Sequence, residues 1–215
     1  AFERIIIVTE SVFSMDGDIA DLQQLVAFKR DFANVALYVD EAHAIGVRGE
    51  SGLGCAEEQG CVAEIDFLVG TFGKAVHSVG GYVVCSRLAR DYLINHMRPL
   101  IFSTALPPIN MAWTDVVLQR LHSLQAERRH LQQLSRALID KVSSLHGHCV
   151  SQSHIVPVLC GSNAAALAQA QALRQHNMLV MAVRPPTVPK NQARLRISLN
   201  SGLSHEQLDA LMACL

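Results

Sequence analysis

The chain has almost no excess of charge of either sign. Its 18 lysines and arginines nearly balance 19 aspartates and glutamates, which gives a formal net charge of −1 at pH 7. A balanced charge makes nucleic acid and anionic membrane surfaces weak candidates as partners. No apolar run approaches the ~20 residues that a membrane-spanning helix requires. The composition, 50% apolar and 17% charged, is that of a globular protein with a sizeable core.

Paired cysteines are also missing from the sequence. The six cysteines are scattered along the chain, and none belongs to a CxxC pair. A disulfide scaffold is not expected in a chain of this length and apolar content, so we expect reduced thiols and a cytoplasmic location. His146, His148 and Cys149 lie close together, but their loop offers no fourth ligand, so we predict no metal site.

Strand-like and helix-like segments alternate along the first two thirds of the chain. The β-branched or apolar runs at 5–9, 35–39 and 67–69 are typical of buried strands, and residues 21–32 form an amphipathic helical pattern. This alternation predicts βα units and a mostly parallel sheet. Further strands are predicted at 82–85, 155–159, 179–183 and 194–199, and further helices at 87–97, from 108 to about 145 with a break, at 163–176 and at 204–214. Because a strand begins within the first ten residues without a lead-in, we expect an N-terminal portion to precede this sequence.

Polar residues follow the predicted strands at the edge where parallel sheets bind ligands. Asp40, Thr71 and Lys74 fall at that edge, and His43 follows three residues after Asp40. Taken singly, Asp40 is explained as a turn cap, His43 as a structural histidine and Lys74 as a solvated loop residue. The chemical alternative is a carboxylate that pairs with a cationic ring nitrogen and a desolvated, nucleophilic lysine that can form a Schiff base. The glycines around Lys74 do not match the GxxxxGK[ST] phosphate loop.

Several arginines are candidates for binding an anion. Arg194 and Arg196 are two residues apart on a predicted strand, so both face the same side, where one can grip a carboxylate in a bidentate manner. The alternative is a pair exposed on an edge strand. Arg184, before two prolines, is a further candidate. Thr104 precedes a predicted helix and either caps it or reaches a phosphate.

Five segments in this order carry a resemblance to a known family. They are "FSMDGD", "VDEAHAIGVRGESGLG", "GTFGKA", "RPLIFSTALPP" and "RPPTVPKNQARLRIS". Together they resemble the α-oxoamine synthases, which are pyridoxal-phosphate enzymes of fold type I. The resemblance implies an α/β fold made of the later part of the large cofactor-binding domain, with a mostly parallel sheet, over residues 1–148. It implies a small C-terminal α/β domain over residues 149–215.

The resemblance also assigns roles to the cofactor-binding residues. Lys74 would hold pyridoxal phosphate covalently, and Asp40 would pair with the protonated pyridine nitrogen. His43 and Ser14 would lie near the phenolic oxygen of the ring. Thr71 would contact the phosphate.

Further roles concern the partner subunit and the substrates. Thr104 would contact the phosphate from the other subunit of a homodimer, and Arg196 or Arg184 would bind the carboxylate of the amino acid. The motifs are most similar to those of the biotin-pathway branch, which implies decarboxylative condensation of L-alanine with pimeloyl-CoA or a pimeloyl-carrier protein. Two alternatives stay open: a synthase that uses glycine or serine with another acyl-CoA, and a non-catalytic truncated paralogue or fragment.

One residue departs from the family's pattern, and some family segments are missing. His77 occupies a position in the glycine-rich turn where related sequences often carry a small residue. The ring-stacking histidine and the glycine-rich phosphate contacts of the family belong to an earlier portion that this sequence does not contain.

Overall fold

A computed structural model describes residues 2–215 of the chain. The chain divides into two compact units, and each unit is made of two separate segments of the sequence. The first unit runs to Val12 and resumes over Ala20–Gln125, whereas the second comprises Phe13–Ile19 and Ala126–Leu215. The sequence predicts a division at 148/149 instead. The two divisions differ mainly in the long helix that precedes residue 148, which belongs to the second unit in the structure.

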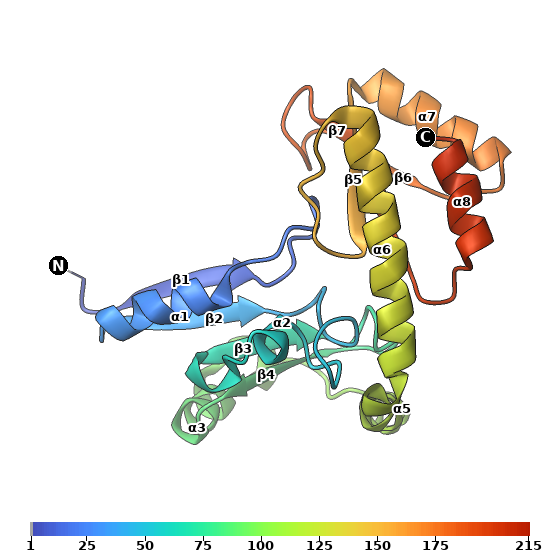
Figure 1. Ribbon diagram of the computed structural model, residues 1–215. Coiled ribbons are helices and arrows are strands. Elements are labelled where there is room, and N and C mark those ends of the chain that lie inside the picture. Colours follow the sequence, from blue (N-terminus) through green and yellow to red (C-terminus); the bar gives the residue numbers. More distant parts are fainter. Residues whose placement is uncertain (1) are drawn as a thin grey trace. The chain divides into compact units, whose positions relative to one another are not determined.

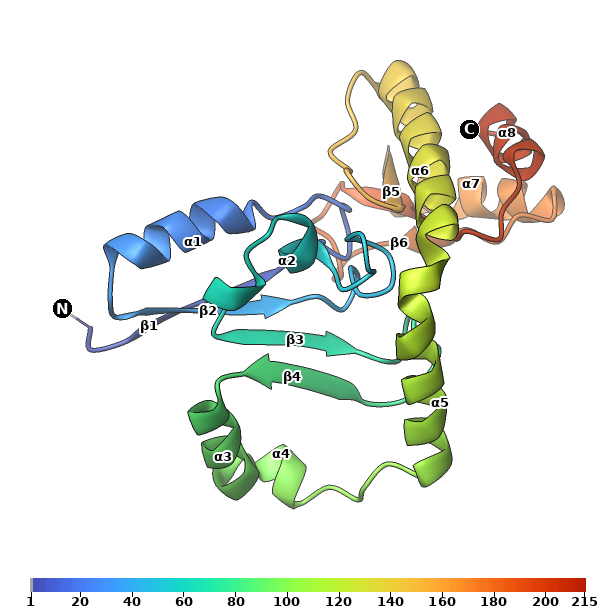
Figure 2. The ribbon, with the colours of Figure 1, turned by 60° about the horizontal axis from the view of Figure 1, so that its bottom comes forward.

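The first unit is built on a four-stranded sheet in the order β1-β2-β3-β4. Its strands are β1 (Ile5–Glu10), β2 (Val35–Asp40), β3 (Phe67–Thr71) and β4 (Gly81–Cys85). The first three are parallel and β4 is antiparallel to β3, as Figure 2 shows. The predicted mostly parallel α/β sheet is therefore confirmed, and each predicted strand is extended by one or two residues.

The first unit also contains helices, which connect and follow the strands of this sheet. They are α1 (Leu22–Asp31), α2 (Cys55–Glu58), α3 (Arg87–His96), α4 (Arg98–Ile101) and α5 (Pro108–Arg120), with the 3-10 helices η1 (Val62–Glu64) and η2 (Leu121–Leu124). Asp21 caps α1 by accepting a hydrogen bond from the amide of Gln24. The helix packs on β2, where Leu37 and Val39 are buried and alternate with more exposed positions.

The opposite face of the sheet remains largely open. Ile6 and Val8 of β1 are 60% and 68% exposed, and Val83 of β4 is 42% exposed. The strand register places these side chains on the same face as Asp40, because Val8 pairs with Tyr38, two residues before Asp40. Exposed apolar side chains of this kind are typical of a face that another polypeptide segment covers.

The second unit contains a small antiparallel sheet with helices beside it (Figure 1). Its strands, β5 (Ile155–Gly161), β6 (Met181–Val183) and β7 (Ala193–Ser198), pair in the order β5-β7-β6. Its helices are α6 (Gln125–His146), α7 (Asn163–Gln175) and α8 (His205–Ala213). Ser204 begins α8 with a capping box to Gln207, so the predicted N-cap is confirmed. The predicted break in the helix from residue 108 onward is η2.

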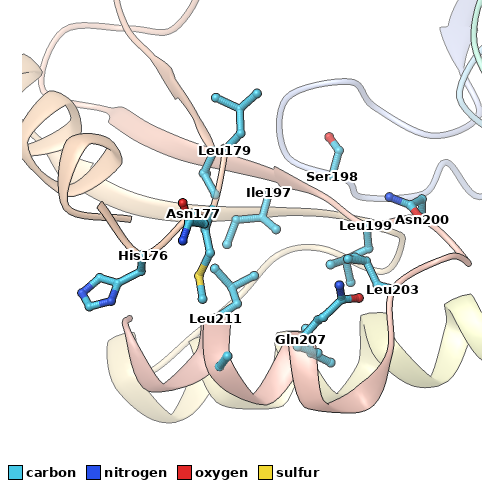
Figure 3. A pocket seen from close by; sticks show the side chains of 14 residues that line it. His176, Asn177, Leu179, Ile197, Ser198, Leu199, Asn200, Leu203, Gln207 and Leu211 are labelled. Carbon is cyan, nitrogen blue, oxygen red and sulfur yellow. The ribbon is translucent and has the colours of Figure 1, made fainter. Parts of the chain in front are cut away.

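An open cavity of about 450 Å³ lies in the second unit beside α8. The side chains of Leu179, Ile197 and Leu211 converge on it from the α7–β6 connection, β7 and α8 (Figure 3). Asn200 and Gln207 contribute polar groups to its lining.

Among the described residues, no helix has the length and hydropathy needed to span a membrane.

Candidate active site

Asp40 is the last residue of β2 and lies at the edge where the parallel strands end. Its carbonyl accepts a hydrogen bond from the amide of Ser11 (2.9 Å) and its Oδ1 accepts one from the amide of Ala42 (2.8 Å). The carboxylate therefore does cap the turn that follows the strand, and it also lines a cavity. This edge is the position at which open parallel sheets bind their ligands.

That cavity, of about 550 Å³, brings Asp40 and Thr71 together. It is enclosed by the strand ends and by residues of α3 and α4, among them Tyr38, Thr71, Leu93 and Leu100. Tyr82 of β4 packs instead against the apolar cluster of Ile45, Val76 and Leu121, and burial raises the pKa of its hydroxyl. The ends of β2 and β3 thus place a carboxylate and a hydroxyl on one largely apolar wall.

Glu41, the residue after Asp40, is fully buried and anchors the turn. Its carboxylate accepts hydrogen bonds from Ser11 Oγ (2.5 Å), the amide of Cys55 (3.0 Å) and the amide of Ala56 (2.7 Å). Burial raises the pKa of Glu41, and these hydrogen bonds oppose the shift. A Cβ at position 54 would lie 2.6 Å from this carboxyl carbon, so only glycine at that position leaves room for the Glu41 carboxylate.

The turn after Glu41 presents His43 to Lys74. The amides of Ala44 and Ile45 both donate to the carbonyl of Glu41, at 2.8 and 2.9 Å, which closes a tight turn around His43. His43 Nε2 lies 2.9 Å from the Nζ of Lys74. The structure thus brings the imidazole and the amine together at this edge.

Apolar packing explains why the two loops meet. Ile45, two residues after His43, and Val76, two residues after Lys74, are both buried in one cluster with Leu121. The neighbouring residues Gly46 and Ala75 are also in close contact, because a Cβ at Gly46 would be 3.0 Å from the Ala75 methyl. Removal of these side chains from water stabilises the contact of the two loops that carry the amine and the imidazole.

The loop that carries Lys74 is also closed on itself. Thr71 Oγ1 donates to the carbonyl of Gly80 (3.2 Å) and accepts from the amide of Gly73 (3.1 Å). The amides of Phe72 and Ser78 bond across the loop, to Gly80 and Phe72 respectively. Phosphate contact by the Thr71 hydroxyl stays a prediction.

His77 adopts a backbone conformation that favours glycine. Its φ is +51°, in the left-handed region that costs most other residues about 1–2 kcal/mol. Its amide donates to the carbonyl of Lys74 (2.9 Å), which closes the turn directly after the lysine. Its own carbonyl accepts a hydrogen bond from Trp113 Nε1 of α5 (2.9 Å). The structure thus gives a physical reason why glycine would suit this position.

The arginine pair of β7 holds the segment 13–19 in the second unit. Arg196 Nε donates to the carbonyl of Ser14 (2.6 Å), and buried Arg194 forms an ion pair with Asp16. Both side chains therefore reach the same side of β7, as the two-residue spacing predicts. Arg196 also donates to Ser198 Oγ (2.8 Å), and burial lowers the pKa of its guanidinium. Ser14 meets Arg196 through its backbone carbonyl.

Two further predicted site residues, Thr104 and Arg184, are exposed. Thr104 is exposed in the connection between α4 and α5. Arg184 is exposed after β6, where its carbonyl accepts the amide of Thr187 (3.0 Å). The sequence reasoning missed Glu41 and Trp113. The "DE" pair after a buried strand was a signal for Glu41, whereas nothing in the local sequence pointed to Trp113.

The chain belongs to the aminotransferase class I and II family, whose model matches residues 1–215. The α/β fold and the lysine, carboxylate and imidazole at the strand ends fit that class. Among curated relatives, the chain is 56% identical over 215 residues to a protein of Pasteurella multocida named "Putative 8-amino-7-oxononanoate synthase". The match covers 100% of this chain and 56% of that protein, so the chain spans about half the length of the relatives it matches.

Solved structures show the same likeness. A serine palmitoyltransferase from S. paucimobilis with a bound PLP–myriocin aldimine is 32% identical with a TM-score of 0.89, over 97% of this chain and 53% of that one. An 8-amino-7-oxononanoate synthase from Francisella tularensis is 30% identical with a TM-score of 0.81, over 99% and 62%. The resemblance to the α-oxoamine synthases and the fold-type-I assignment are confirmed, and the expected pyridoxal phosphate agrees with the family and with that complex.

The residues present fit pyridoxal phosphate chemically. Lys74 offers a primary amine, with an imidazole in hydrogen-bond reach. Asp40 offers a carboxylate, which can accept a hydrogen bond from a protonated ring nitrogen, and Thr71 offers a hydroxyl on the same cavity wall. This donor set contains the nucleophile and the counter-charge that a covalently held pyridinium requires.

Proposed function

We propose that the whole protein is a pyridoxal-phosphate-dependent acyltransferase of the α-oxoamine synthase type. It condenses L-alanine with a pimeloyl thioester and releases 8-amino-7-oxononanoate, carbon dioxide and the free thiol of coenzyme A or a carrier protein. The observation that carries the proposal is the Lys74 amine 2.9 Å from His43 Nε2, on loops that follow β2 and β3. All six cysteines are free thiols, which fits the cytoplasmic location expected from the sequence.

Three residues at the strand ends perform the chemistry in this proposal. When bound, pyridoxal phosphate supplies an electron sink for a carbanion at the α-carbon of the amino acid. Lys74 Nζ holds the cofactor covalently and, once displaced by the amino acid, takes the α-proton. The Asp40 carboxylate keeps a proton on the ring nitrogen by offering it a negative partner. His43, whose Nε2 faces Lys74 Nζ, orients the amine and donates to the phenolic oxygen.

Substrate and cofactor anions are assigned to hydroxyls and arginines. Thr71 binds the phosphate, and Ser14 lies near the phenolic oxygen. Arg196 binds the carboxylate of alanine, with Arg184 as the alternative residue for that role. The partial burial of Arg196 supports its assignment, because a guanidinium held away from water forms stronger hydrogen bonds to a carboxylate. Arg184 is exposed.

A homodimer completes the site in this proposal, with Thr104 reaching the phosphate of the partner subunit. The surroundings of Thr104 support this arrangement. Phe102 and Ile109, which flank it, are 74% and 76% exposed, and Leu100 is 54% exposed. Large apolar side chains gathered around one exposed loop are typical of an interface with another chain.

The choice of substrate is tested by product analysis. The curated relative at 56% identity favours alanine and a pimeloyl thioester, whereas the serine palmitoyltransferase structures keep serine with a long-chain acyl-CoA as the second candidate. The full-length protein is incubated with alanine, glycine or serine and with pimeloyl-, acetyl- or palmitoyl-CoA, and the products are identified by mass spectrometry. Turnover of serine with palmitoyl-CoA, and not of alanine with pimeloyl-CoA, would replace the proposed substrates.

Cofactor capture separates the enzyme from a non-catalytic paralogue. The full-length protein is mixed with pyridoxal phosphate, reduced with borohydride and digested, so that a covalent pyridoxyl group is located by peptide mass. We expect the label on Lys74 and none in Lys74→Ala. Lys190→Ala, which changes an exposed lysine elsewhere, serves as the matched control and keeps the label. A protein that takes up no label on Lys74 would be the non-catalytic alternative.

A further inference from the structure

Helix α5 is bonded to the lysine-bearing loop at two consecutive residues. Trp113 Nε1 donates to the carbonyl of His77 (2.9 Å), and Thr114 Oγ1 donates to Ser78 Oγ (2.7 Å). Thr114 is buried, at 8% exposure, whereas Trp113 keeps 49% of its surface exposed. The helix therefore holds the end of the loop from one side, three to four residues after Lys74.

His77 links this helix to the lysine through its backbone. Its amide is bonded to the carbonyl of Lys74, and its carbonyl to the indole of Trp113, so a two-bond path runs from α5 to the main chain of Lys74. The left-handed φ of +51° is unfavourable for histidine, so this turn needs a contact that selects it. The indole N–H, which donates and cannot accept, supplies that contact at the carbonyl.

We propose that Trp113 is a positioning residue for Lys74, a role that rests on the proposed function of Lys74. By holding the His77 carbonyl, the indole keeps the turn 74–77 in its left-handed form and the Lys74 amine beside His43. Trp113 lies outside the cavity that Asp40 and Thr71 line. In this role Trp113 acts on Lys74 through its hydrogen bond to the loop.

The first test measures the turn itself, without cofactor. Amide hydrogen exchange at His77 and Ser78 is compared in the full-length protein and in Trp113→Phe, which keeps an aromatic ring and removes the N–H. We expect exchange about tenfold faster in the variant, the effect of losing one hydrogen bond that stabilises the closed turn. Met111→Leu, an exposed apolar change on the same helix, is the matched control and leaves the exchange unchanged. Equal exchange in Trp113→Phe and wild type would overturn the proposal.

The second test measures the placement of the amine. Visible circular dichroism per bound pyridoxal phosphate reports how the cofactor is held, and we expect a loss of about half or more in Trp113→Phe. Adding His77→Gly allows the left-handed turn without strain, so the double variant should regain most of the signal. A tryptophan that served only as an apolar surface residue would show no rescue by a change at residue 77.

The two proposals fail in different ways. If the wild-type protein captures no cofactor on Lys74, the proposed function fails, and the exchange measurement still decides whether Trp113 holds the turn. If cofactor is captured and Trp113→Phe leaves both the exchange and the dichroism unchanged, the positioning role fails while the proposed function stands.

Discussion

The Nζ of Lys74 and the Nε2 of His43 lie 2.9 Å apart, although 31 residues separate them in the sequence. Neither strand end brings this about alone. Ile45 and Val76, each two residues after one of the polar groups, are buried together in one cluster that joins the two loops. The amine and the imidazole are therefore set by an apolar contact between two loops, and perturbing that contact should disturb the chemistry.

Replacing His43 tests its proposed role beside the amine. His43→Ala removes the ring that faces Lys74 Nζ, and we expect kcat for the alanine and pimeloyl-CoA reaction to fall by about a hundredfold or more. Because His43 is only partly buried, the unfolding temperature should change little. Steady-state kinetics and a thermal unfolding scan on the full-length protein provide the two measurements. Full turnover by the variant would remove His43 from the site.

The two arginine candidates are separated by conservative substitution. Arg196→Lys keeps the charge and removes the planar fork, so KM for alanine should rise by roughly tenfold to a hundredfold, as expected for a weakened charged hydrogen-bond pair. Arg184→Lys is the matched control, because that side chain is exposed, and its KM should stay at the wild-type value. The reverse pattern would transfer the carboxylate-binding role to Arg184.

The buried Glu41 carboxylate makes the stability depend on pH in a defined direction. Burial raises the pKa of Glu41 in the folded protein above the ordinary value of 4.5, so the folded state binds the proton more tightly than the unfolded state does. Its contribution to stability is therefore complete below the unfolded pKa and is lost as pH rises through the raised folded pKa. Denaturant unfolding of wild type and Glu41→Gln across this range should show that the difference in free energy of unfolding shifts in favour of the variant as pH rises. A pH-independent difference would contradict the shift.

Alanine substitutions at two glycines distinguish the cost of a steric clash from the cost of backbone strain. Gly17 and Gly60 have nearly the same left-handed φ, +71° and +66°, but a Cβ at Gly17 would lie 1.9 Å from the carbonyl oxygen of Ile155 and one at Gly60 would meet nothing within 4 Å. Gly60→Ala should cost about 1 kcal/mol in the free energy of unfolding, from strain alone. Gly17→Ala should cost more than about 3 kcal/mol, because backbone must move. Equal costs would show that the contact at Gly17 relaxes easily.

Much of the fold follows from periodicity in the sequence. The buried strand at Val35–Asp40 and the Ser204 cap are local patterns, and both are present in the structure. The sheet order and the pairing of loops are different, because they depend on contacts between residues far apart in the chain. Periodicity within a single sequence carries no information about which loop meets which.

The candidate site was likewise predictable only in part from the sequence. Asp40, His43 and Lys74 were found because strand ends gather polar residues, and the resemblance to a family gave each a role. Glu41 was missed because a carboxylate beside a strand end is usually solvated, and its burial depends on Ser11 and on the amides of α2. Trp113 was missed because its partner, His77, is 36 residues away and lies in an irregular turn.

The segment 13–19 gives the chain an unusual order of assembly. Asp16 is joined to Arg194 across 178 residues, and both neighbours of the segment in sequence belong to the other compact unit. During synthesis this segment leaves the ribosome long before β7, the strand to whose arginines it is bonded. The second unit therefore cannot close until β7 has been synthesised, and a polypeptide begun at residue 126 would lack the segment that Arg194 and Arg196 bind.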